Sequence, residues 1–165
     1  GRALIATSKE WIVSEQPTLQ LLGASWLLLG PESNLATSTL KRLAQEDSTV
    51  GKLAELQLWR TVPPPETMKR VTGWMETRDR LLPALQLGPT EFLADRLMRI
   101  GETELAVGQV LRIASEPHGR YHRLRPILVR ARDALNSKNL ESEAEKLEVW
   151  INELGASANA STTTP

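Results

Sequence analysis

Apolar residues recur at steps of three and four through most of this 165-residue chain, which is the spacing of amphipathic helices. The pattern predicts helices over residues 3–13, 18–29, 35–44, 50–59, 66–82, 90–100, 102–115, a basic segment ending near Ser137, and 140–154. No alternation of apolar and polar residues extends far enough to predict a strand. We therefore expect an all-α fold of about nine helices, paired through short connections as antiparallel hairpins.

Helix-breaking residues interrupt this pattern at nearly regular intervals. The breaks lie at Pro31, at residues 63–66, at Gly101 and at Asn139. Five residues after each break stand Ala36, Val71, Ala106 and Ala144, separated by 35, 35 and 38 residues. Such a period is typical of stacked helical hairpins, in which each hairpin covers the apolar face of its neighbour. We expect the helices of a hairpin to cross at small residues, with Ala24 opposite Ala36 and Ala94 opposite Ala106.

The segment from Phe92 to Pro117 resembles a tetratricopeptide repeat. The matching positions are Leu93, Ala94, Leu97, Gly101, Ala106 and Val110, with Pro117 near the family's terminal proline. More divergent copies extend the resemblance over residues 17–154. It implies a right-handed solenoid whose inner groove binds peptides or partner domains, and a HEAT-like array of helical pairs is the alternative.

The predicted organisation is a leading helix over 1–16, the hairpin array over 17–154 and a disordered tail over 155–165, which lacks apolar residues of useful size. The proline run 63–65 is expected to connect two helices of one hairpin, with Trp59 and Trp74 packing across it. Five tryptophans supply most of the aromatic content, and at helical spacing they are expected mainly in the core.

The composition argues against several classes of function and site without identifying one. The formal net charge is zero, so overall charge predicts no attraction to nucleic acid or membranes. The absence of cysteine excludes disulfides and thiolate metal sites. Neither a signal-peptide layout nor a transmembrane segment is present in the sequence, and a cytoplasmic location is slightly favoured. The compartment and the oligomeric state are not determined by these features.

One pair of histidines has metal-ligand spacing. His118 and His122 are four residues apart, but Gly119 occupies the position of the metalloprotease glutamate, so we expect no metal site there. No catalytic constellation and no cofactor-binding motif is recognised, and we expect a protein that is not an enzyme.

A basic cluster extends from Arg112 to Arg132. Its candidate anion-binding residues are Arg120, Arg123, Arg125 and Arg130. Guanidinium groups suit phosphate or carboxylate ligands, but the acidic helix downstream is expected to neutralise them. We expect no nucleic-acid partner, because aromatic platforms and excess positive charge are lacking.

The tetratricopeptide resemblance places a partner groove on the first helix of each hairpin. Its candidate residues are Arg60, Glu91, Asp95, Met98, Arg99 and Asp133, and the mapping also includes Leu21, Ser25 and Leu28. The sequence thus predicts a non-catalytic protein–protein interaction or scaffolding module for a protein or peptide partner. Anion, acidic-peptide or nucleic-acid binding through the basic cluster is one alternative, and an accessory domain of a larger enzyme is another.

Overall fold

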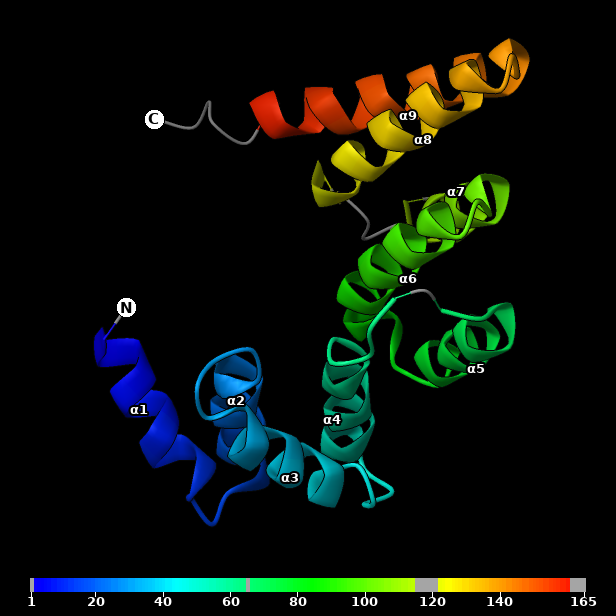
Figure 1. The fold of residues 1–165 in the computed structure, drawn as a ribbon. Coiled ribbons are helices and arrows are strands. Elements are labelled where there is room, and N and C mark those ends of the chain that lie inside the picture. Colours follow the sequence, from blue (N-terminus) through cyan, green and yellow to red (C-terminus); the bar gives the residue numbers. More distant parts are fainter. Residues whose placement is uncertain (1, 65, 115–121, 161–165) are drawn as a thin grey trace. The chain divides into compact units, whose positions relative to one another are not determined.

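The computed structural model describes residues 2–64, 66–114 and 122–160, and within them every regular element is a helix (Figure 1). The all-α class is therefore confirmed. The chain divides into two compact units, Gly1–Pro64 and Pro65–Pro165, which we call unit 1 and unit 2. Unit 1 holds α1 (Arg2–Ile12), α2 (Pro17–Leu27), α3 (Ser33–Leu43) and α4 (Thr49–Trp59). Unit 2 holds α5 (Met68–Asp79), the short helix η1 (Pro83–Leu85), α6 (Leu87–Arg99), α7 (Thr103–Ala114), η2 (His122–Leu124), α8 (Arg125–Ser137) and α9 (Glu141–Ala160).

Consecutive helices pack against each other in unit 1. α2 lies between α1 and α3, and α4 contacts both α2 and α3. The core is aliphatic and consists mainly of Ile12, Ala24, Leu27, Leu28, Ala36, Leu40, Leu43 and Ala54. Ala24 and Ala36 are completely buried, as a crossing at small residues requires. Burial of this apolar surface is the main favourable term in folding the unit.

The backbones of α1 and α2 approach each other closely at Gly23. A Cβ atom at this position would lie 2.6 Å from the carbonyl oxygen of Ser8 and 2.7 Å from the backbone nitrogen of Ile12. Both distances are shorter than any ordinary carbon contact, and both involve backbone that cannot rotate away. Only glycine lets the two helices cross at this separation.

Unit 2 repeats the same kind of packing. α6 pairs with α7, and α8 contacts both of them and also α9. α5 packs on α6, where the rings of Trp74 and Phe92 meet edge to face with centroids 5.6 Å apart. Ala94 and Ala106 are completely buried, together with Leu97 and Val110. The small residues of the predicted repeat thus lie in the core of their pair.

Two helices of unit 2 end in the same hydrogen-bonded turn. After α6, Glu102 N donates to Leu97 O at 2.9 Å, and Gly101 N donates to Met98 O at 3.1 Å. After α8, Leu140 N donates to Leu135 O and Asn139 N donates to Asn136 O, both at 3.0 Å. Gly101 and Asn139 have positive φ angles of 90° and 58°. These are Schellman caps, for which glycine and asparagine are preferred, and they explain why the predicted breaks fall at these residues.

Three elements differ from the sequence-based expectation. α6 begins at Leu87, so Pro89 lies inside its first turn, where the missing N–H costs nothing. α9 continues to Ala160 through residues that were expected to be disordered, and the remainder of that tail lies outside the described residues. The proline run lies at the division between the two units, so Trp59 and Trp74 belong to different units and their expected pairing stays a prediction.

We expect Gly23→Ala to lower the free energy of unfolding of unit 1 by about 1–3 kcal/mol, because an added methyl group forces α1 away from α2. Gly30→Ala is the matched control, since a Cβ there meets only the Leu27 carbonyl oxygen at 3.5 Å. Urea denaturation followed by circular dichroism compares the two variants with the wild type. Equal midpoints for all three proteins would contradict the close crossing.

Candidate functional site

The two charged sets singled out in the sequence meet in unit 2. Arg123 donates to Glu91 across 2.8 Å, and Arg130 donates to Asp95 across 2.9 Å. Arg99 also pairs with Asp95, at 2.8 Å. The acids of the expected partner groove on α6 are therefore the counterions of two arginines of the expected anion site.

Glu91 lies in the less exposed half of this cluster. Its side chain is 21% exposed, whereas that of Arg123 is 62% exposed. Burial raises the pKa of Glu91 above the ordinary glutamate value, and the nearby charge of Arg123 lowers it. The ionised carboxylate of Glu91 thus depends on Arg123 for compensation.

Two further arginines of the basic cluster form hydrogen bonds to other groups of unit 2. Arg125 donates to the carbonyl oxygen of Ile151 at 3.2 Å. Arg132 donates to Glu148 at 2.6 Å and to Asp133 at 2.7 Å, and these hydrogen bonds raise its pKa. The expected pairing of the basic helix with the acidic helix α9 is therefore present at Arg132, while Arg123 and Arg130 pair with α6 instead.

Several candidate residues fall outside this cluster. Arg120 and His118 lie outside the described residues, as does the side chain of His122. Of the expected groove residues, Arg60 belongs to unit 1, and Met98 is half-buried on α6.

Among the described residues, no group of three or more histidines, aspartates or glutamates is arranged to hold a metal ion.

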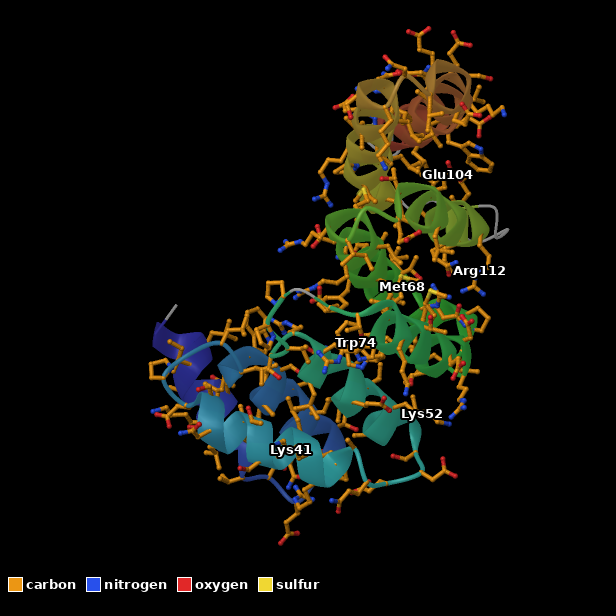
Figure 2. The ribbon with its side chains drawn as sticks, turned by 45° about the vertical axis from the view of Figure 1, so that its right-hand side comes forward. Lys41, Lys52, Met68, Trp74, Glu104 and Arg112 are labelled. Carbon is orange, nitrogen blue, oxygen red and sulfur yellow. The ribbon has the colours of Figure 1, made fainter. Side chains whose placement is uncertain are left out.

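A buried polar network in unit 2 joins α5, α6 and α7. Arg78 of α5 is only 1% exposed and donates to Asp79, Thr90 and Gln109, at 2.9, 3.4 and 2.7 Å. Arg112, labelled in Figure 2, extends from α7. It donates to the same Asp79 carboxylate at 2.9 Å. Burial lowers the pKa of Arg78, and its hydrogen bond to Asp79 opposes that shift. Sequence reasoning missed this network, because a single arginine on an amphipathic helix gives no sign that it is buried.

A second buried ion pair fixes the segment that precedes α5. Glu66 has a fully buried side chain and forms an ion pair with Arg96 of α6. The guanidinium carbon of Arg96 lies 4.8 Å from the centre of the Phe92 ring, a cation–π contact. The second carboxylate oxygen of Glu66 is buried without a hydrogen bond. The Arg78 network joins three helices, and the Glu66–Arg96 pair joins α6 to the segment before α5.

A hollow of about 210 Å³ lies between the two Schellman turns of unit 2. Its polar lining includes Glu102, Glu104 and Lys138, and Lys138 donates to the carbonyl oxygen of Gly101 at 3.3 Å. No histidine lines it. Its open shape and scattered charges do not resemble a site for acid–base chemistry.

An exposed apolar stripe follows one side of α2. We call Leu19, Leu22 and Trp26 of α2, together with Leu29 in the turn that follows it, the α2 stripe. Leu22 is 41% exposed, Trp26 61% and Leu29 68%, and Leu19 is half-buried. Leu21 and Leu28, which the resemblance places in the groove, are buried instead. The sequence did not identify the stripe, because α2 is apolar on nearly all sides and its periodicity cannot tell which face points outward.

Comparisons with known protein families, with curated proteins and with solved structures find no match for this chain. Of the helices in the described ranges, none combines the length and apolar character needed to cross a bilayer.

We expect Arg78→Met to lower the free energy of unfolding of unit 2 by about 2–3 kcal/mol, because it leaves the polar groups of Thr90 and Gln109 without their charged donor. Arg130→Met removes an exposed pair and should cost less than about 1 kcal/mol. Urea denaturation of both variants provides the measurement. Similar losses for the two would show that the Arg78 network does not stabilise the unit.

We also expect Arg123→Gln to raise the pKa of Glu91 further, since burial then acts without an opposing cation. The titration is followed by NMR of the Glu91 carboxyl carbon, with Arg130→Gln as the control. When the pKa of a carboxyl group is higher in the folded than in the unfolded protein, the group's contribution to the stability of the fold is lost as pH rises from the unfolded pKa to the folded pKa. Arg123→Gln should therefore widen the pH interval over which this contribution is lost. An unchanged Glu91 titration would show that the two groups are not coupled.

Proposed function

We propose that this chain is a non-catalytic protein-binding module, built as a tetratricopeptide-like array of helical hairpins. The repeated packing supports the array: α4 contacts both helices of the preceding pair, and so does α8. One hydrogen bond also links residues that are one expected repeat apart: Arg60 donates to Ser25 O across a separation of 35 residues.

The α2 stripe is the observation that carries the binding function. Large apolar side chains exposed singly are normal, but several aligned on one helix face mark an interaction surface. Tryptophan is also the residue type most enriched at the energetic centres of interfaces. Of the tryptophans, Trp59 and Trp74 are buried and Trp26 is the exposed exception.

Anion binding through the basic cluster is the weaker alternative. A strong anion site presents guanidinium groups whose donors are free for the ligand. Here Arg123, Arg130 and Arg132 each pair with a carboxylate, and Arg125 binds a backbone carbonyl. An acidic ligand would first have to displace these partners.

The test is a selection of random displayed peptides on the immobilised protein. Peptides that bind the wild type should bind the Trp26→Ser, Leu29→Ser double variant at least about tenfold more weakly, as expected for loss of an interface centre. Val149→Ser is the matched control, because it removes an apolar side chain that is 58% exposed in unit 2.

Two results would contradict the proposal. Peptides that bind all three proteins equally would place the binding surface elsewhere. Peptides that lose binding only on Arg123→Glu would favour the anion alternative.

A further inference from the structure

The α2 stripe has the spacing of a coiled-coil seam. Leu19, Leu22, Trp26 and Leu29 are separated by three, four and three residues, which is the alternation of a and d positions in a heptad. The first three lie on α2, and Leu29 follows Leu28, whose backbone is still helical after the last residue of α2. The opposite side of α2 is occupied within unit 1, where Leu21, Ala24 and Leu27 are buried. One apolar side of α2 thus packs within unit 1, and the stripe is a second apolar side that remains uncovered. Its spacing suits contact with another helix.

One cation borders this seam. Arg60 of α4 donates to the carbonyl oxygen of Ser25 at 3.4 Å, which places its guanidinium beside the turn of α2 that carries Trp26. Its other acceptor is Gln57 Oε1, at 2.8 Å. Both acceptors are neutral, and α2 itself carries no charged residue. A carboxylate on the bound helix would therefore supply the counterion that these contacts lack.

The same charge distribution disfavours two other occupants. In a two-fold dimer formed through α2, each copy would bring an Arg60 to the interface and no acid from α2 itself, so like charges would face a shared surface. Helices that lie on a membrane surface combine an apolar face with several lysines or arginines, and α2 has neither residue type.

We propose that the α2 stripe binds an amphipathic helix of another protein, whose apolar a and d residues pack on Trp26 and Leu29 and whose glutamate or aspartate pairs with Arg60. This inference rests on the proposed function and specifies its partner. Specificity comes from the seam spacing and from the sign of the charge on the partner's flank.

The probes are three synthetic peptides of about 14 residues, enough for nearly four helical turns. All carry leucine at the a and d positions. The first has glutamate at the flanking positions, the second has lysine there, and the third is the glutamate peptide with a central proline that prevents a continuous helix. Affinity for the whole chain is measured by fluorescence anisotropy, and folding of each variant is checked by circular dichroism.

We expect the glutamate peptide to bind about tenfold more tightly than the lysine peptide, and the proline peptide to bind at least tenfold more weakly than its parent, a difference of about 1.4 kcal/mol in each case. Arg60→Gln should abolish the preference for glutamate while some binding remains. Trp26→Ser should remove binding of all three peptides. Leu82→Ser, which changes a leucine that is 67% exposed in unit 2, should leave binding unchanged.

Each contrary result contradicts a specific part of the proposal. Equal affinity for the glutamate and lysine peptides removes the role of Arg60, and equal affinity for the proline peptide removes the helical partner. Absence of binding by every peptide overturns the inference, and the proposed function survives it only if the random selection yields peptides that depend on Trp26. Self-association lost on Trp26→Ser, seen by sedimentation, would identify a second copy as the occupant. Binding to phosphatidylcholine vesicles lost on the same variant would identify a membrane surface.

Discussion

The close contact between helix backbones is the constraint on which both units depend. Helices that carry leucine on most of their inner positions can reach each other only where a small residue stands at the crossing. Gly23 performs this role between α1 and α2. In the α6–α7 pair, Ala94 and Ala106, where the sequence predicts the crossing, are completely buried. Larger residues one turn away, such as Leu97 and Val110, then fill the space on either side. A side chain added at the crossing would separate both helices along their length.

Charged residues in unit 2 form hydrogen bonds and ion pairs between helices that also share the apolar core. The buried Arg78 and the buried pair Glu66–Arg96 are costly to desolvate, so their value lies in fixing which elements meet. Arg78 joins α5 to Thr90 of α6 and Gln109 of α7, and Arg96 joins α6 to the segment before α5. The exposed pairs Arg123–Glu91 and Arg130–Asp95 join α6 to the next pair of helices along the chain and contribute little energy each. A cluster that looks like a ligand site in the sequence thus serves largely to align neighbouring helices.

The two units differ in the surface that they expose. In unit 2, Arg123, Arg130 and Arg132 each pair with a carboxylate. Unit 1 exposes Leu22 and Trp26 on α2 and Leu29 just after it, and Arg60 binds the carbonyl oxygen of Ser25 beside them. Burial of these apolar side chains against a partner would be favourable, which is why the proposal of a helical partner begins from α2.

The sequence by itself determined the helical class, the positions of most helices and the turns at Gly101 and Asn139, because these depend on local periodicity and on backbone conformations that few residues adopt. It also pointed to the small residues that lie at the core of each pair. Only the tertiary structure decided that Arg123 and Arg130 pair with α6, that Arg78 is buried, and that the exposed side of α2 carries Trp26. Those outcomes depend on which helices become neighbours in space, and on which face of a nearly uniformly apolar helix is left uncovered.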